Sequence, residues 1–294
     1  MECADKNVYV LIEPSVTRLG NWMFQYAAAR AAEPAARISF FISNRAEWAD
    51  VERRHELFPD VTIVDRVPEG VQIRRGLFQE ARYVPLGVVR ELYRCPPRVA
   101  AYLQWTYGEL LGRPNLVSIH VRRGDYLELP HRHPFVGAAY LQRAVKTVCE
   151  KVAQPTFVVC SDDLPWCKSF FTASRFPGLE FCFAADDGGV MGDLFLMSRC
   201  HHHICSNSTF SWWGAYLGVA SQKSADNPIT IFPSMWFGLQ LRHENWQGLY
   251  FDGCTVLHNG YKFPMLVRAL AHMAKTMCGD ILRALHLRKR WNDR

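Results

Sequence analysis

The feature that most constrains the fold is the alternation of short apolar segments with helical patterns in the second part of the chain. Most of these segments contain β-branched or aromatic residues, and they predict strands at residues 116–120, 156–160, 179–184, 203–205 and 229–232. Strands that alternate with helices form parallel sheets. We therefore predict a parallel α/β unit over residues 116–265.

The first part of the chain shows the same alternation. Strands are predicted at residues 8–12, 37–43 and 61–64, and an alanine-rich helix is predicted after a turn formed by Gly20 and Asn21. Helical spacing runs from residue 83 to 112, interrupted at residues 95–97. Residues 1–115 are therefore expected to form a first α/β unit, and two such units face each other across a cleft.

The charge of the chain is concentrated at its end. The 294 residues include 34 Lys and Arg against 28 Asp and Glu, a formal net charge of +6. Seven of the basic and two of the acidic residues lie beyond residue 265, so the rest of the chain carries only +1. A nearly neutral body does not favour nucleic acid binding, and we expect no nucleic acid partner.

Residues 266–294 predict a C-terminal basic amphipathic helix. Apolar residues recur at helical spacing from Leu266 to Leu285, and basic residues gather at the end. One interpretation, which we favour, is a helix that packs back across the two domains. The other is an interfacial anchor, by which the protein would contact anionic lipids on the inner face of the membrane.

The start of the chain and its cysteines favour a cytoplasmic location. The opening residues show no basic segment followed by an apolar one, so we expect no secretory signal. The ten cysteines are scattered and several lie in predicted strands, which favours reduced thiols. No apolar stretch approaches the roughly 18 residues of a bilayer-spanning helix.

A cluster of charged residues follows the strand predicted at residues 116–120. His120, Arg122, Arg123 and Asp125 stand at its carboxyl end, the edge where parallel sheets bind ligands. The planar guanidinium of arginine suits a carboxylate or a phosphate. The alternative is that Arg122 only pairs with Asp125 while Arg123 points into solvent.

Two further polar segments follow strands. Asp162 and Asp163 come after the strand at residues 156–160; one is expected to cap the next helix and the other to accept hydrogen bonds from a ligand such as guanine. Hydroxyl and amide side chains then precede a helix with small residues. The run comprises Ser206, Asn207, Ser208, Thr209, Phe210 and Ser211. Such a run suits a phosphate or ribose, although an ordinary N-cap explains part of it.

The segment Cys200-His201-His202-His203-Ile204-Cys205 has the residue types of a metal site but not the spacing. Neighbouring residues on a strand point to opposite faces, so three consecutive histidines cannot all reach one ion. The acidic pairs at residues 162–163 and 186–187 lack the spaced carboxylates of a manganese site. We predict no metal site.

Four blocks in the same order resemble the bacterial α-1,2-fucosyltransferases of glycosyltransferase family 11. They lie at residues 19–27, 120–126, 160–166 and 193–215, and the resemblance extends over about residues 8–257. The His-x-Arg-Arg-Gly-Asp block is shared more widely among α-1,2-, α-1,6- and O-fucosyltransferases. The family usually has Gly-Gly-Leu-Gly-Asn-Gln where residues 17–22 of this chain are Thr-Arg-Leu-Gly-Asn-Trp.

The resemblance implies a GT-B-like pair of Rossmann-type domains. The second would hold GDP-β-L-fucose, and the acceptor, usually a β-galactoside, would enter from the first. Fucose would pass to a 2-hydroxyl with inversion and without a metal or other cofactor, because Arg122 would act at the diphosphate in place of a divalent ion, with Arg123 assisting or holding the loop. The other implied donor-binding residues are His120, Asp162, Asp163, Asn207, Ser208, Thr209, Phe210 and Ser211. The implied cleft residues of the first domain are Gly20, Asn21 and Gln25.

An inverting transfer needs a base to take the proton of the acceptor hydroxyl. Asp125 is the first candidate, but it suits equally well a structural role that locks Arg122 or Arg123, since pairing with arginine lowers the pKa of a carboxylate. Glu128 and Asp193 are lesser candidates. The alternative functions are a noncatalytic sugar- or nucleotide-binding protein that keeps the fold, and a fucosyltransferase of other linkage.

Overall fold

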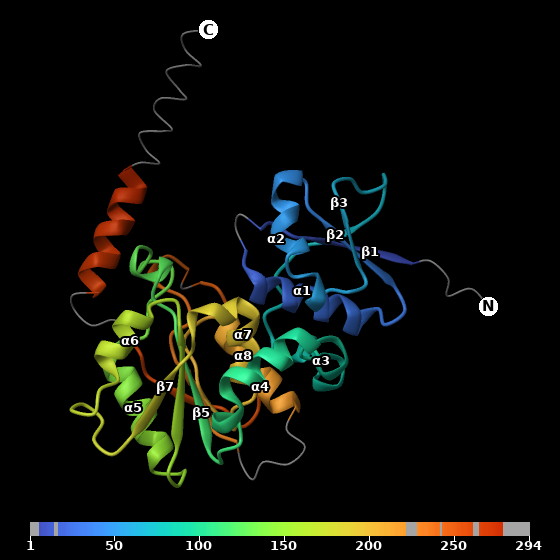
Figure 1. Ribbon diagram of the computed structural model, residues 1–294. Coiled ribbons are helices and arrows are strands. Elements are labelled where there is room, and N and C mark those ends of the chain that lie inside the picture. The colour runs from blue at the N-terminus through green and yellow to red at the C-terminus, as the bar shows by residue number, and fades with distance from the viewer. Residues whose placement is uncertain (1–5, 15–16, 222–227, 242, 261–264, 279–294) are drawn as a thin grey trace.

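In the computed structural model the chain forms two α/β units that lie side by side (Figure 1). The structure describes residues 6–14, 17–221, 228–241, 243–260 and 265–278. The predicted tail beyond residue 278 lies outside these residues. Each unit contains one sheet whose strands are all parallel, which confirms the predicted α/β class.

The first unit is a four-stranded sheet in the order β3-β2-β1-β4. Its strands are β1 (Asn7–Leu11), β2 (Arg37–Phe41), β3 (Val61–Val64) and β4 (Ile73–Arg74), and its helices are α1 (Leu19–Ala32), α2 (Trp48–Glu52) and α3 (Leu86–Leu92). The three predicted strands are confirmed. The fourth, β4, was not predicted, because two residues are too few to show an alternating pattern.

The prediction that Gly20 and Asn21 form a turn before the helix was wrong. The helix α1 begins at Leu19, and Arg18 precedes it in an extended conformation, so both residues lie in its first turn. Glycine is needed at position 20 for a different reason. A Cβ atom there would lie 2.5 Å from Thr209 Oγ1, so the missing side chain lets the start of α8 approach α1 closely.

The second unit is a six-stranded sheet in the order β10-β9-β8-β5-β6-β7. Its strands are β5 (Leu116–Val121), β6 (Thr156–Ser161), β7 (Glu180–Phe183), β8 (His202–Ile204), β9 (Thr230–Pro233) and β10 (Thr255–Leu257). Its helices are α5 (Ala138–Cys149), α6 (Leu164–Phe170), α7 (Gly189–Ser198) and α8 (Thr209–Ser221), and α4 (Pro97–Leu111) packs on α7. All five predicted strands are present. Only the three-residue β10 was missed.

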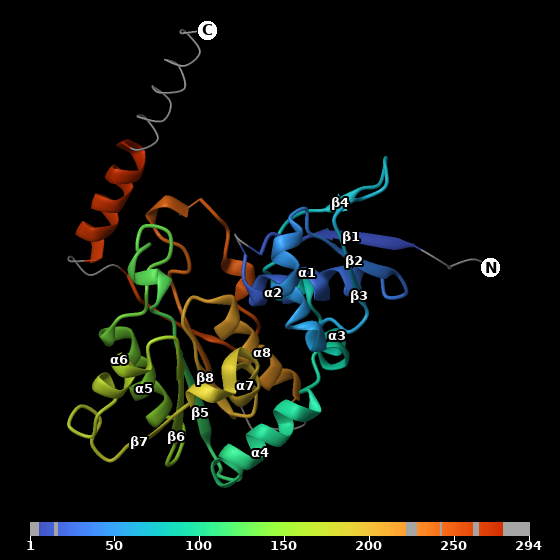
Figure 2. The ribbon, with the colours of Figure 1, turned by 45° about the horizontal axis from the view of Figure 1, so that its top comes forward.

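Helices cover both faces of the second sheet (Figure 2). Val117 and Ile119 of β5 pack with α5 on one face, in a cluster that also takes in residues of α6. Val158 and Cys160 of β6 belong to the cluster on the other face, which contains residues of α7 and α8. The second cluster also contains residues of the first unit, such as Val10 and Phe24, so this second face is the one turned toward the first unit.

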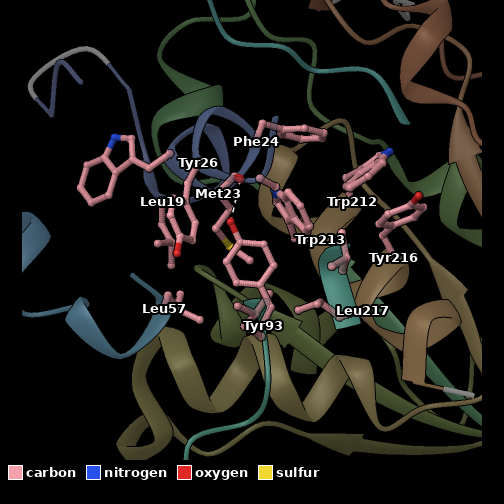
Figure 3. Packing of buried hydrophobic residues seen from close by; sticks show 14 of the residues in the cluster. Leu19, Met23, Phe24, Tyr26, Leu57, Tyr93, Trp212, Trp213, Tyr216 and Leu217 are labelled. Carbon is pink, nitrogen blue, oxygen red and sulfur yellow. Dashed lines mark hydrogen bonds between the residues drawn. The ribbon is translucent and has the colours of Figure 1, made fainter. Parts of the chain in front are cut away.

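The two units share one apolar core. Helices α1 and α3 of the first unit both pack on α8 of the second. At this contact the Phe24 ring lies 4.5 Å from Trp212 and 4.9 Å from Trp213, and Trp213 Nε1 donates to Gly20 O at 2.8 Å (Figure 3). These rings are fully buried, so separating the units would expose a large apolar surface to water.

Residues 265–278 form a helix that lies beside the second unit in both views (Figures 1 and 2). Met265 and Ala269 are buried, and the His272 ring stacks on His131 at 5.5 Å. Among the described residues, no helix combines the length and the apolar character that crossing a membrane requires.

Candidate functional site

The strand β5 directs the two adjacent arginines to opposite sides. Along β5, Ser118 bonds to His203 of β8 and the His120 ring lies near Phe210 of α8, whereas Val117 and Ile119 pack with α5. Arg122 and Arg123 continue this alternation just past the strand end. They therefore meet different surroundings.

Arg122 stands between two carboxylates. Its Nη2 lies 2.8 Å from Asp125 Oδ1, and its Nη1 lies 3.0 Å from Asp162 Oδ2. Its Cζ also lies 5.7 Å from the centre of the Tyr126 ring. The Arg122 side chain is still 29% exposed. This guanidinium is thus oriented by its neighbours and remains accessible to an anion from solvent.

Arg123 is packed rather than solvated. Its Nε donates to Asp163 Oδ2 at 2.9 Å, and its Cζ lies 3.9 Å from the centre of the Trp166 ring. Only 13% of its side chain is exposed. The alternative interpretation was therefore right that Arg122 pairs with Asp125, although Arg122 also pairs with Asp162, and it was wrong that Arg123 points into solvent.

The two aspartates after β6 bind the segment that follows β5 and contains Arg122 and Arg123, called here the arginine loop. Asp162 Oδ1 accepts from the backbone N–H of Arg123 at 2.8 Å, and Asp163 Oδ1 accepts from the N–H of Trp166, which caps α6. A Cβ atom on Gly124 would lie 2.6 Å from Asp162 Oδ2, so a larger residue there would displace the Asp162 carboxylate. One aspartate caps the helix as predicted, and both are engaged by arginine.

The loop between β8 and α8 lies next to this cluster. Tyr126 OH donates to Asn207 O at 3.0 Å, and His120 Nδ1 lies 3.0 Å from Ser206 Oγ. Asn207 Nδ2 donates to Trp236 O, while none of the described residues offers the buried Asn207 Oδ1 a hydrogen bond. Ser208 lies in the same loop, so the structure brings the two predicted polar segments together.

The first turn of α8 contains Thr209, Phe210 and Ser211. Ser211 Oγ accepts from the N–H of Ser206 at 3.1 Å, and the Phe210 ring lies 5.3 Å from the His120 ring. Burial, helped by the charge of Arg122, lowers the pKa of His120 to about 3. This imidazole is therefore neutral at pH 7 and orders the loop as a hydrogen-bonding group rather than as a cation.

The predicted cleft residues of the first unit lie on α1. Gly20 meets Thr209 at the start of α8, and Asn21 Oδ1 accepts from Gln79 Nε2 at 2.7 Å. Gln25 Nε2 donates to Leu11 O at 2.8 Å, while its buried Oε1 has no partner among the described residues. Gly20 is thus brought to the polar loop of the second unit, whereas Asn21 and Gln25 are bonded within their own unit.

The three candidate bases differ in their surroundings. Asp125 pairs with Arg122 at the start of a short 3₁₀ helix (Asp125–Leu127). Glu128 directly follows this helix and is exposed. Asp193 lies on α7 near Asp186; burial, followed by repulsion from that carboxylate, raises its pKa to about 6. Of these three candidate bases, Asp125 is the one that contacts the arginine cluster, which comprises Arg122, Arg123 and their carboxylate partners.

Residues that the sequence argument did not assign complete the cluster. Tyr126 joins the arginine loop to the α8 loop and stacks on His133 at 4.8 Å. Trp166 and Phe135 lie over the guanidinium of Arg123. Tyr126 and Trp166 both fall in the blocks singled out above, so aromatic residues within a charged motif were the available signal.

The three consecutive histidines bond to different neighbours. His201 Nδ1 accepts from Leu116 N, His202 Nδ1 accepts from Ile229 N, and His203 Nδ1 lies 2.8 Å from Ser118 Oγ. These partners lie in β5 and just before β9, on either side of β8. The geometry agrees with the argument that strand alternation separates the rings.

Two cavities lie away from the arginines. One of about 700 Å³ is lined by residues at the amino ends of β5, β8 and β9, including Asn115, His202 and Thr230, and one of about 710 Å³ lies along α4 beside Trp105. Parallel sheets bind ligands at the carboxyl ends of their strands. We therefore place the candidate site at the arginine cluster.

Residues 99–233 match the model of glycosyl transferase family 11. The O-antigen biosynthesis glycosyltransferase WbnK of Escherichia coli is 33% identical over 126 residues, which cover 42% of this chain and 39% of WbnK. An alpha-1,2-colitosyltransferase of the same species is 37% identical, covering 42% of this chain and 41% of that protein. A galactoside alpha-(1,2)-fucosyltransferase 1 of Bos taurus is 39% identical, covering 36% and 30%.

The chain thus spans about two fifths or less of the length of these relatives. Among solved structures, a NodZ alpha-1,6-fucosyltransferase soaked with GDP-fucose covers 72% of this chain and 93% of its own, with 11% identity and a TM-score of 0.41. That likeness is too weak to add to the assignment. The matched segment contains most of α4, the two arginines with their carboxylate partners, and the loop before α8. Over residues 99–233 the chain is therefore similar to glycosyl transferase family 11.

Proposed function

We propose that this protein transfers L-fucose from GDP-β-L-fucose to the 2-hydroxyl of a galactoside, with inversion and without a metal ion. The observation that carries the proposal is the state of Arg122, which is oriented by two carboxylates and yet still accessible. The name of the bovine relative specifies the same linkage and a galactoside acceptor. A cytoplasmic location, where the nucleotide sugar would be available, is part of the proposal.

The chemistry sets the main demand on the site. Transfer breaks the bond between fucose C1 and the β-phosphate oxygen, so negative charge builds up on the departing diphosphate. Arg122 would neutralise this charge through its guanidinium. The hydroxyls of Ser208, Thr209 and Ser211, with the positive end of α8, would donate to the same oxygens.

The other residues of the cluster would position this machinery. Arg123 is held by Asp163 and Trp166, so we assign it to the stability of the loop rather than to the diphosphate. His120 would act through Ser206 as a neutral partner. The nucleotide would extend from this point along the loops that follow β6 and β8, past Asp162 and Asn207.

The test is GDP release from GDP-β-L-fucose in excess EDTA, with and without lactose or N-acetyllactosamine. We expect acceptor-stimulated release that survives chelation and is lost in Arg122→Ala. Arg132→Ala, an exposed arginine in the following loop, is the matched control and should retain activity. Release that EDTA abolishes would overturn the metal-independent mechanism, and donor binding without any release would favour a noncatalytic binding protein.

The sugar of the donor is tested in the same assay. One relative is named a colitosyltransferase rather than a fucosyltransferase. Release from GDP-colitose in preference to GDP-fucose would keep the mechanism and correct the donor. Product linkage, read by NMR, separates transfer to the 2-hydroxyl from transfer to another position.

Asp125→Asn separates the two proposed roles of this residue. As the base, Asp125 would take the proton of the acceptor hydroxyl, and the variant would lose transfer while keeping donor binding and slow donor hydrolysis. As a clamp on Arg122, its loss would weaken donor binding as well. GDP-fucose binding by calorimetry, measured beside transfer, distinguishes the outcomes.

A further inference from the structure

The helix at residues 265–278 has two apolar faces rather than one. Its inner face packs on the second unit through Met265 and Ala269, which are 8% and 0% exposed, and through the stack of His272 on His131. These three positions are four and three residues apart, the spacing of one helix face. A helix that only packs on the body needs no second apolar face.

The outer face nevertheless exposes large apolar side chains. Val267, Leu270 and Met277 are 48%, 51% and 61% exposed. They are three of the nine large apolar residues that are exposed in the described part of the chain. Ala271 and Ala274 are exposed between them, so the stripe is continuous over three turns.

The charge around this stripe has one sign. Arg268 and Lys275, seven residues apart, are exposed along its edge, and residues 265–278 include no acidic residue. The sequence that follows adds five basic residues against Asp280 and Asp293. A second copy of this chain would bring like charges together at such a face, whereas an anionic lipid surface would complement both its charge and its apolar stripe.

We propose that the outer face of this helix docks on the surface of an anionic lipid bilayer. The helix would lie in the plane of the interface, with Val267, Leu270 and Met277 among the acyl chains and the basic side chains at the headgroups. Docking itself does not depend on the function proposed above. If that function holds, docking also sets the acceptor class. The helix contacts His131, which lies only six residues beyond Asp125, so a docked helix would keep the candidate site near glycans that are linked to lipids.

The experiment is co-sedimentation of the full chain with vesicles of phosphatidylcholine alone and of phosphatidylcholine with phosphatidylglycerol. We expect binding to the anionic vesicles only, weakened by salt. The triple variant Val267→Ser, Leu270→Ser, Met277→Ser should bind at least about tenfold more weakly, because it removes most of the apolar surface that docking would bury. Val71→Ser, Val190→Ser, Val256→Ser removes exposed apolar side chains elsewhere and should bind like the wild type.

Three outcomes would overturn the proposal: no binding to anionic vesicles, equal binding by the triple variant, or a concentration-dependent dimer that the triple variant abolishes. The last would assign the face to a second copy. Circular dichroism and the melting temperature confirm that the variants fold. GDP release with a soluble acceptor, unchanged in the triple variant, separates failure of docking from failure of the proposed activity.

Discussion

The two units of the molecule hold their polar groups in different ways. In the second unit, Arg122 is oriented by Asp125 and Asp162 and keeps part of its surface in water. In the first unit, the amides of Asn21 and Gln25 are bonded to Gln79 and to backbone carbonyls. Arg122 of the second unit thus remains accessible to an anion, whereas the amide groups of Asn21 and Gln25 are engaged within the first unit.

Under the proposed function, we expect this difference to separate the donor reaction from acceptor recognition. Stabilising a departing diphosphate requires fixed positive charge, and the charged cluster lies within residues 99–233, the segment that matches the family model. Residues before 99, including α1, lie outside that match. We therefore expect changes in the first unit to alter acceptor choice or stability, and changes in the second to alter turnover.

The largest effect is expected from Arg122→Lys. Lysine keeps the charge but loses the planar fork that two carboxylates now orient. We expect kcat/KM for the donor to fall by about 100- to 1000-fold. Asn21→Ala in the first unit is the counterpart and should leave GDP release without acceptor unchanged. An equal fall in both variants would show that the first unit takes part in the donor reaction, and the contrast between the units would be lost.

The contact between the units is tested by Gly20→Ala. The added Cβ would meet Thr209 Oγ1 at 2.5 Å and the Thr209 backbone carbon at 2.8 Å, and backbone cannot move aside cheaply. We expect the free energy of unfolding to fall by about 1–3 kcal/mol.

The control for this substitution is Gly87→Ala, at an exposed helical glycine of α3 with nothing within 4 Å of the new atom. It should be neutral or stabilise by up to about 1 kcal/mol. Urea unfolding measures both variants. A Gly20→Ala protein as stable as the wild type would mean that α1 and α8 are not held together as the structure shows.

The sequence predicted the architecture well because strand length and spacing carry most of that information. Five of the six strands of the second sheet and the placement of Arg122 at the end of β5 follow from local pattern. The role of Gly20 could not be predicted, since it depends on Thr209, a residue 189 positions away whose approach no local pattern shows. The alternation of side chains along a strand also predicts that Arg122 and Arg123 point in opposite directions, as the structure shows.

The buried histidines predict a loss of stability in acid. Burial lowers the pKa of His120 to about 3, against 6.5 for an exposed histidine. Between these values the unfolded chain takes up a proton that the folded chain does not, so stability falls as pH drops below 6.5, by up to about 1.4 kcal/mol per pH unit for this group.

The measurement is the unfolding free energy of wild type and His120→Gln at several values between pH 5 and 7. The slope of the unfolding free energy against pH should be shallower in the variant, by the amount that corresponds to the uptake of about one proton on unfolding. Asp193, whose raised pKa of about 6 acts in the opposite direction, is present in both proteins and cancels in the difference. Equal slopes would show that His120 is not neutral in the folded protein.

The smallest effect is expected from Trp166→Leu, which removes the ring under Arg123. The guanidinium carbon lies 3.9 Å from the ring centre, and such a contact is worth about 0.5–2 kcal/mol. Because Arg123 also keeps its bond to Asp163, we expect a stability loss near the lower end and a donor KM changed by less than about threefold. Trp105→Leu, at a side chain 91% exposed, should change the unfolding free energy by no more than about 0.5 kcal/mol. If Trp166→Leu instead lowers turnover as far as Arg122→Lys does, Arg123 reaches the donor itself, and both arginines, not one, face the departing diphosphate.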